Sequence, residues 1–179
     1  QTGILAGNSA TAPTTPTRTG YTFAGWDKSY SNVTEDLIVT ATYTINTYTV
    51  KFFDKDNNQI GTTQTVNYGG NATAPTAPVV TGYTFSGWDK SYSNVTEDLI
   101  VTATYTINTY TVTFKNWNGD VLKTQSVAYG SAATEPTVPA RAGYTFTGWD
   151  ADFGYVTGDI IATATFSTNA YSVTFKDWN

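Results

Sequence analysis

The 179-residue sequence has no cysteine, no histidine and few charged residues, which make up only 13% of the chain. Without cysteine the chain can form neither a disulfide bond nor a thiolate zinc site. Without histidine it lacks the side chain that most often serves as a general base or metal ligand. No apolar run approaches the length of a membrane-spanning helix. The net charge of −5 argues against binding to nucleic acids and to anionic membranes.

Threonine and aromatic residues are what the chain has in excess. It contains 37 threonines, and aromatic residues make up 15% of the sequence. Both types suit the half-buried surface of a sheet, so the sequence predicts a mainly β protein. Asn118 and Gly119 predict a type I′ hairpin turn. Alternation of apolar and polar residues predicts strands over 83–88, 99–105, 110–114 and 121–127.

The sequence repeats itself with a period of 62 and then 61 residues. Residues 20–52 and 82–114 differ at only two of 33 positions, and residues 143–175 match the second copy at 19 of 33. A unit of this length is a small domain, and no flexible linker separates the copies, so we expect tandem domains in an extended rod. The predicted division is an incomplete first repeat without its first strand over 1–46, a complete second repeat over 47–108, a complete third repeat over 109–169, and an orphan first strand over 170–179.

An ordered signature runs through residues 47–108 and again through residues 109–169. It reads Y-T-V-x-F, V-x-Y-G, P-T-x-P, G-Y-T-F-x-G-W-D and V-T-x-D. This pattern resembles the Listeria–Bacteroides repeat, the B repeat of internalin-type surface proteins. The resemblance implies small β-grasp-like domains, an extracellular or cell-surface location, and a role as spacer, stalk or adhesion module. It implies neither catalytic residues nor a cofactor.

The two ends of the sequence complement each other, because 170–179 carries a first strand and 1–46 carries a repeat without one. The sequence leaves two explanations open. In the first, the chain is a segment of a longer covalent array, with neighbouring repeats as its partners. Alternatively, 170–179 of one copy inserts into 1–46 of the next and builds a head-to-tail filament by donor-strand addition. The side chains that would be inserted are Tyr171, Val173, Phe175 and Trp178.

Aromatic residues at the ends of strands are the candidate core and the candidate sugar-binding platforms. Each tryptophan that follows Tyr-Thr-Phe-x-Gly could stack on a sugar or anchor a core. The core interpretation is favoured, because large aromatic side chains dominate small cores. The predicted repeat core comprises Trp26, Trp88, Trp149, Tyr83, Phe85, Tyr144 and Phe146.

Two acidic segments are candidates for chemistry, and neither is convincing. Residues 54–58 resemble the start of a calcium loop but lack its later glycine and glutamate, so a hairpin turn is favoured and no metal site is predicted. Glu97 and Asp98 are adjacent, but neighbouring strand residues point to opposite faces. We interpret this pair as a solvated turn before the last strand.

The sequence predicts a non-enzymatic extracellular bacterial structural protein whose repeats form a stalk or fibre. No nucleophile–base pair can be assembled from its residues, so no enzymatic activity is expected. The alternative function is an adhesin module that binds a glycan or a host protein through loops and exposed aromatic residues. No nucleic-acid partner and no membrane insertion are expected.

Overall fold

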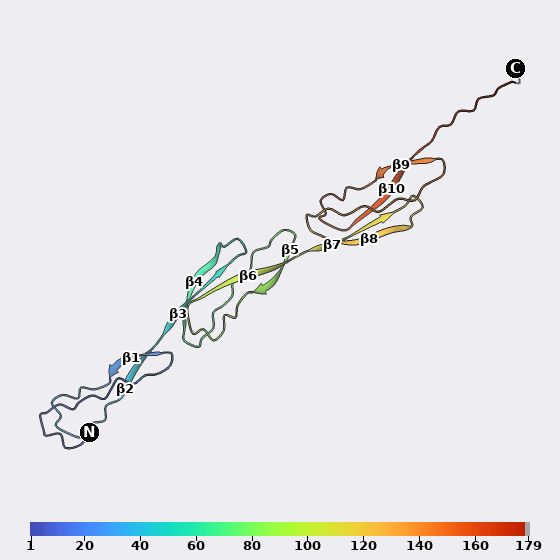
Figure 1. Cartoon of the computed structure of the whole chain (residues 1–179). Coiled ribbons are helices and arrows are strands. Elements are labelled where there is room, and N and C mark those ends of the chain that lie inside the picture. Colours follow the sequence, from blue (N-terminus) through green and yellow to red (C-terminus); the bar gives the residue numbers. More distant parts are fainter. Residues whose placement is uncertain (178–179) are drawn as a thin grey trace. The chain divides into compact units, whose positions relative to one another are not determined.

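The computed structural model describes residues 1–177 and contains strands and loops, with no helix in that range (Figure 1). The prediction of a mainly β protein is confirmed, while the finer β-grasp assignment stays a prediction. Residues 1–177 accordingly hold no helix long and apolar enough to cross a lipid bilayer. The strands are β1 (Tyr21–Trp26), β2 (Ala41–Ile45), β3 (Thr47–Phe53), β4 (Gln59–Asn67), β5 (Tyr83–Trp88), β6 (Leu99–Ile107), β7 (Thr109–Lys115), β8 (Val121–Ala128), β9 (Tyr144–Trp149) and β10 (Ile160–Thr168).

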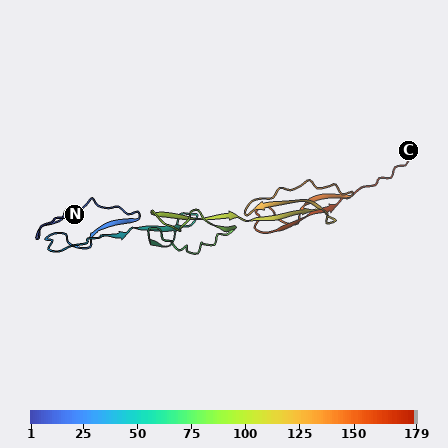
Figure 2. The ribbon, with the colours of Figure 1, turned by 90° about the horizontal axis from the view of Figure 1, so that it is seen from below.

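The strands form three small sheets (Figure 2). One is the two-stranded sheet β1-β2, and the other two have the orders β4-β3-β6-β5 and β8-β7-β10-β9. The chain divides into two compact units, which comprise residues 1–78 with 87–104, and residues 79–86 with 105–179. The first unit holds β1 to β4 and most of β6, and the second holds β7 to β10.

The centre of each four-stranded sheet is a parallel pair of strands. β3 pairs with β6 from Val50↔Leu99 onward, and β7 pairs with β10 from Val112↔Ile160 onward. On its other side, β3 pairs antiparallel with β4, and β7 pairs antiparallel with β8. The first strand of each complete repeat therefore lies between the second and the last strand, where both of its edges are hydrogen-bonded.

Period-two alternation along β3 and β7 buries every second side chain. Val50, Phe52, Val112 and Phe114 are all 0% exposed. Each complete repeat has its own cluster of buried residues, and the two clusters correspond position by position. The clusters are Val50, Phe52, Val66, Ala72, Val95 and Val101 in the second repeat, and Val112, Phe114, Val127, Ala133, Val156 and Ala162 in the third.

The buried phenylalanine of the first strand contacts two further aromatic rings. The Phe52 ring centroid lies 4.9 Å from that of Trp88 and 5.6 Å from that of Tyr92. In the third repeat the corresponding distances from Phe114 to Trp149 and Phe153 are 4.8 and 4.9 Å. All four contacts are edge-to-face, the geometry that aromatic pairs prefer.

Three residues that the sequence analysis placed in the core are instead exposed. Tyr83, Phe85 and Phe146 keep 38%, 40% and 39% of their surface. Phe146 pairs with Phe166 near the end of β10, beyond Thr163, where the pairing with β7 stops. The sheet is only two strands wide there, which leaves such side chains partly open to water.

The hairpin at residues 116–120 lies where the sequence predicts it, but its turn type differs. The Gly119 N–H donates to the Asn116 carbonyl at 3.1 Å, so the central residues are Trp117 and Asn118. A type I′ turn needs a positive φ at both, and neither has one. Gly119, with φ 91°, follows the turn instead. This is the longer hairpin loop in which a residue in the left-handed region follows a type I turn.

Candidate functional site

Residues 1–39 form an open groove that corresponds to the core of a complete repeat. The groove has a volume of about 830 Å³, and apolar side chains line it together with polar ones such as Glu35 and Asp36. Val33 and Val39 are only half-buried there, whereas their equivalents Val95 and Val101 are 4% and 0% exposed. The apolar lining residues include Ala10, Trp26, Tyr30, Val33, Leu37 and Val39.

In the complete repeats the first strand, β3 or β7, occupies the position of this groove. Trp26 and Tyr30 are the equivalents of Trp88 and Tyr92, which enclose Phe52. Among the described residues, none from 1–46 belongs to the fully buried core. The predicted core residue Trp26 is therefore half-buried on the wall of a groove, while Trp88 and Trp149 pack against complete cores.

Asp36 lines the groove, and its equivalents in the complete repeats, Asp98 and Asp159, accept a backbone hydrogen bond from the first strand. Asp98 accepts a hydrogen bond from the Thr49 backbone N–H at 2.7 Å, and Asp159 accepts one from Thr111 at 2.8 Å. The bond from Thr49 is the main cause that lowers the pKa of Asp98 below its ordinary value of 3.8. The equivalent Asp36 has no such partner among the described residues.

The interpretation of Glu97 and Asp98 as a solvated turn misses this contact. Both side chains are exposed, but Asp98 fastens the start of the last strand to the first strand of the same repeat. A signal was present in the sequence, because the aspartate occurs in all three copies whereas Gly158 replaces the glutamate in the third. The partner lies 49 residues away, so local reading could not supply it.

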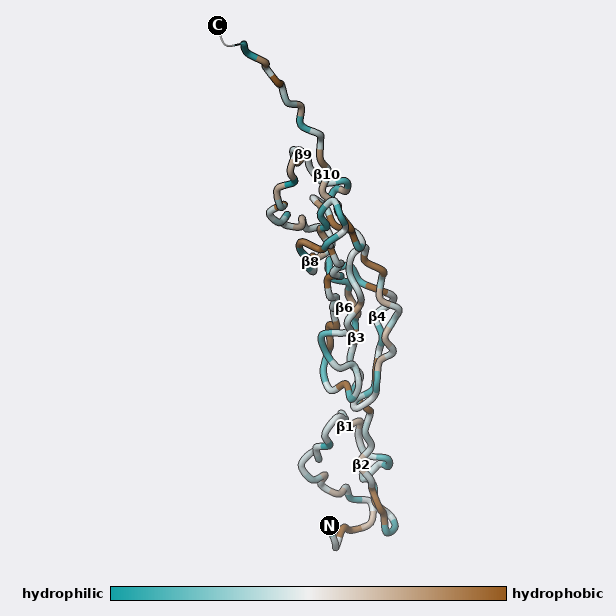
Figure 3. Tube along the Cα trace, turned by 90° about the vertical axis from the view of Figure 1, so that its right-hand side faces the viewer, coloured by the Kyte–Doolittle hydropathy of each residue, from teal (hydrophilic) through white to brown (hydrophobic). Residues whose placement is uncertain are grey.

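The segment after β10 carries the side chains predicted to act as a donor strand. Tyr171, Val173 and Phe175 are 78%, 76% and 93% exposed, and Trp178 lies outside the described residues. Residues 170–177 pair with no described strand. Hydrophobic and hydrophilic residues alternate along this segment (Figure 3), as they do in β3 and β7.

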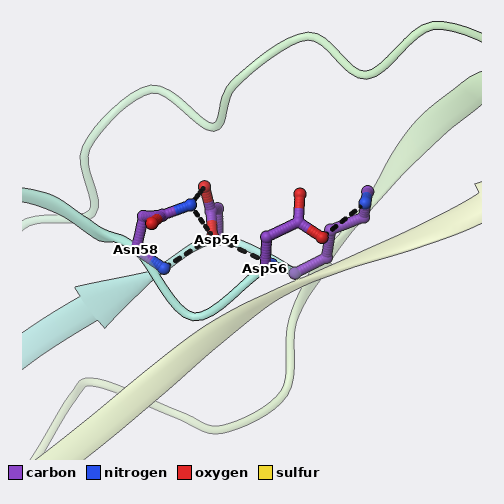
Figure 4. A network of polar contacts seen from close by, with 4 residues as sticks. Asp54, Asp56 and Asn58 are labelled. Atoms are coloured by element: carbon purple, nitrogen blue, oxygen red, sulfur yellow. Dashed lines mark hydrogen bonds and ion pairs between the residues drawn. The ribbon is translucent and has the colours of Figure 1, made fainter.

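The acidic segment 54–58 forms a hairpin turn (Figure 4). The Asp54 carboxylate accepts backbone hydrogen bonds from Asn58 at 2.8 Å and Asp56 at 2.9 Å, and the Asn58 bonds lower its pKa. Lys55 forms an ion pair with Asp56 at 2.7 Å. In the third repeat the neutral Asn116 makes the equivalent backbone contacts. The Asp54 carboxylate thus accepts the backbone hydrogen bonds that stabilise the turn. Residues 1–177 contain no cluster of three or more potential metal ligands.

Two aromatic rings on the surface of the third repeat, those of Tyr144 and Trp117, contact other protein groups. The Arg141 guanidinium lies 3.6 Å from the centroid of Tyr144, a predicted core residue that is half-buried, and 5.5 Å from that of Trp117. Trp117 also contacts Phe166, with a centroid separation of 5.2 Å. Other aromatic side chains of this repeat are exposed, among them Tyr155 at 63%, so the adhesin alternative stays a prediction.

An asparagine joins each repeat to the next. The Asn108 N–H donates to the Gly82 carbonyl at 2.8 Å, and the Asn108 carbonyl accepts from the Tyr129 N–H at 2.8 Å. Its side-chain Oδ1 accepts from the Thr84 hydroxyl at 2.6 Å. Asn46 makes the same three contacts with the equivalent residues Gly20, Tyr68 and Thr22.

The junction glycines are required by a close approach. The Tyr129 ring lies directly on Gly82, where an added Cβ would come within 2.1 Å of the ring. Tyr68 lies on Gly20 in the same way, at 2.0 Å. A side chain at either glycine would displace the ring. These junctions were not predicted from the sequence, although Gly, Tyr and Asn recur there at fixed spacing.

Comparison with protein-family models assigns three stretches to the Listeria–Bacteroides repeat domain, namely residues 1–47, 48–109 and 110–175. The chain belongs to the Listeria–Bacteroides repeat family. The three matches cover nearly the whole chain and confirm the resemblance drawn from the sequence.

Relatives of this repeat protein include much longer proteins. Internalin H of Listeria monocytogenes is 38% identical over 140 residues, which are 72% of this chain and 25% of that protein. Two proteins of Evansella cellulosilytica, named as a membrane protein and a Gly-rich membrane protein, are 33% and 30% identical over 160 and 190 residues. They match 78% and 88% of this chain, and 24% and 22% of their own length. The chain thus spans about a quarter of each relative.

A solved structure, that of Mub-RV, aligns with 70% of this chain and with the whole of its own chain. The sequence identity is 12% and the TM-score is 0.20, so the likeness carries no argument about this protein.

Replacing Asp98 with Asn tests the aspartate contact. The pKa of Asp98 is lowered in the folded state, so its negative charge stabilises the fold at pH values above the ordinary carboxyl pKa. This stabilisation is lost as the pH falls through the pKa of Asp98 in the folded state. We expect Asp98→Asn to lower the melting temperature at pH 7. We also expect the melting temperature of the variant to fall less than that of the native chain as the pH is lowered. Circular dichroism measures both. The neighbouring Glu97→Gln is the matched control, and equal melting temperatures for the two variants would contradict the assignment.

Proposed function

We propose that these repeats act as a non-enzymatic spacer in an extracellular or cell-surface protein. The observation that carries the proposal is the junction between repeats. One residue, Asn46 or Asn108, separates the last strand of one repeat from the first strand of the next. Its three hydrogen bonds reach both repeats. So short and so constrained a connection restricts bending, which suits a part that holds other domains at a distance.

Family membership supports a surface location. Internalin H contains a matching stretch, and the two Evansella cellulosilytica relatives are named as membrane proteins. Because the match covers about a quarter of those proteins, their remaining parts have room for other roles. A chain of small β-grasp-like repeats would supply length between such parts and an anchor.

Small-angle X-ray scattering of the full chain tests the spacer function. A compact globule of this size has a radius of gyration of about 16 Å. We expect a clearly larger value, and a value near that of the globule would contradict the proposal. A Gly-Ser-Gly-Ser insertion after Asn108 should broaden the distance distribution, because it removes the one-residue connection. The same insertion beside the exposed Val79 is the control and should leave the distribution unchanged.

The proposal includes end-to-end assembly, in which residues 171–175 of one copy occupy the groove of a second copy. Val173 and Phe175 correspond to Val50 and Phe52, the two fully buried side chains of β3. In the groove, Phe175 would meet Trp26 and Tyr30. The Ser172 backbone N–H, equivalent to that of Thr49, would reach Asp36. An exposed segment with alternating apolar side chains and an open groove that is partly apolar favour strand addition.

Lysine substitutions at two adjacent positions test strand addition. Phe175→Lys would place a charge inside the groove and should abolish self-association of the full chain in sedimentation velocity. Thr174→Lys is the matched control, since the second repeat already carries Lys51 at that position of β3. Association that Phe175→Lys leaves intact, or a native chain that stays monomeric at every concentration, would refute the assembly.

A further inference from the structure

Arg141 carries a positive charge that no other charge in the described part of the third repeat neutralises. Its guanidinium lies 3.6 Å from the centroid of the Tyr144 ring, and 5.5 and 5.8 Å from the centroids of Trp117 and Phe166. The side chain is half-buried, and its guanidinium forms no ion pair and no hydrogen bond with any residue of 1–177. Stacking on a ring uses the face of the guanidinium plane, so the N–H donors along its edge stay available.

A half-buried cation of this kind suits an anionic ligand. Moving a charge partly out of water is unfavourable unless an opposite charge or a hydrogen-bond acceptor replaces the lost hydration. The aromatic rings beside Arg141 supply only part of that compensation. A carboxylate at the edge of the guanidinium would accept two parallel N–H bonds, which is the strongest arrangement between these two groups.

The surface next to Arg141 offers an exposed aromatic ring. Phe146 follows Tyr144 by two residues on β9, so both side chains leave the same face of the strand. The Phe146 ring lies 5.7 Å from that of Phe166, which Arg141 also contacts, and 39% of Phe146 stays exposed. An apolar platform and a cation with free donors are therefore joined through one shared ring.

The same features occur in the repeats that another repeat follows. In the first repeat, the Arg18 guanidinium lies 3.8 Å from the centroid of Tyr21. In the second repeat, Phe85 is the equivalent of Phe146 and keeps 40% of its surface. Neither the arginine stack nor the exposure of the phenylalanine thus depends on where the sequence stops.

We propose that Arg141 and Phe146 form a binding site for an acidic sugar, meaning one pyranose ring that carries a carboxylate. The carboxylate would accept hydrogen bonds from the Arg141 guanidinium, and the C–H groups on one face of the sugar would pack on the Phe146 ring. We call this surface of Arg141, Tyr144 and Phe146 the arginine site. It goes beyond the spacer function and does not depend on end-to-end assembly.

Charge and size favour a single acidic sugar over an acidic peptide. The net charge of −5 opposes the approach of a ligand with many negative charges, whereas one carboxylate needs only one cation. The arginine site offers one guanidinium and one exposed ring, which match one carboxylate and one sugar ring. An extended peptide gains its affinity from a longer row of backbone contacts and side-chain pockets.

The second repeat provides a natural comparison, because it lacks the arginine. Val80 stands at the position of Arg141, and Tyr83, the equivalent of Tyr144, is exposed where Tyr144 is half-buried. We therefore expect no acidic-sugar binding in the second repeat. The first repeat has Arg18, but its Phe23 is half-buried, so weaker binding is expected there.

Nuclear magnetic resonance titration of the full chain with methyl β-D-glucuronide tests the arginine site, because it reports which residues respond. We expect the Arg141 Nε–H and Phe146 N–H resonances to shift. Methyl β-D-glucoside differs from this probe only in lacking the carboxylate. It should bind at least tenfold more weakly, since loss of hydrogen bonds to a charged group accounts for a factor of that size.

Two valine substitutions assign the affinity to Arg141. Arg141→Val should reduce the affinity for the glucuronide to that for the glucoside. The variant should still fold, because the second repeat has valine at this position, and unchanged resonances of the buried residues would verify this. Lys123→Val is the matched control: it removes one positive charge elsewhere in the same repeat, where Lys123 donates to the Thr134 carbonyl, and should leave the affinity unchanged.

Three results would overturn the arginine site: equal affinity for the two sugars, affinity that survives Arg141→Val, or no shift of the Arg141 and Phe146 resonances. The peptide acetyl-Glu-Phe-amide separates the two ligand classes. If it shifts the same resonances and binds more tightly than the glucuronide, the site is one for acidic peptides and the sugar assignment is wrong. None of these results bears on the spacer function, which the scattering experiment tests separately.

Discussion

The insertion of one phenylalanine between two other aromatic rings is the contact on which each complete repeat depends. Phe52 and Phe114 come from the first strand of their repeats, and both are fully buried. The rings around them come from the last third of the same repeat. The first strand therefore packs against parts of the chain that follow it by several tens of residues. In the first repeat, where no described strand takes this position, the same rings line an open groove.

A second constraint acts where repeats meet. The asparagine between two repeats is hydrogen-bonded to the repeat that ends and to the repeat that begins, and a tyrosine ring lies on a glycine beside it. Because the first strand of a repeat follows this asparagine directly, the residues that build a core and those that build a junction are neighbours in sequence. Packing within a repeat and the connection between repeats thus use adjacent residues of the chain.

Sequence reasoning found the elements governed by local patterns and missed those governed by distant contacts. Alternation located β7 and β8, and the repeat itself fixed which positions correspond. The turn type at Asn118 was wrong, because a three-residue loop and a two-residue loop share the Asn-Gly signal. Phe146 was assigned to the core because large aromatic side chains dominate small cores, although the sheet is too narrow there to cover it. The Asp98 contact depends on Thr49, far away in sequence, and no local pattern reports it.

Unfolding of the Phe114→Ala variant in urea, followed by tryptophan fluorescence, tests most directly whether this aromatic contact holds a repeat together. We expect the third repeat to lose about 3–5 kcal/mol of unfolding free energy, the usual cost of deleting a buried phenyl ring. Ile161→Ala in the same repeat removes a side chain that is 60% exposed, and it should change the unfolding free energy by less than about 0.5 kcal/mol. A loss for Phe114→Ala no larger than that of Ile161→Ala would contradict the account.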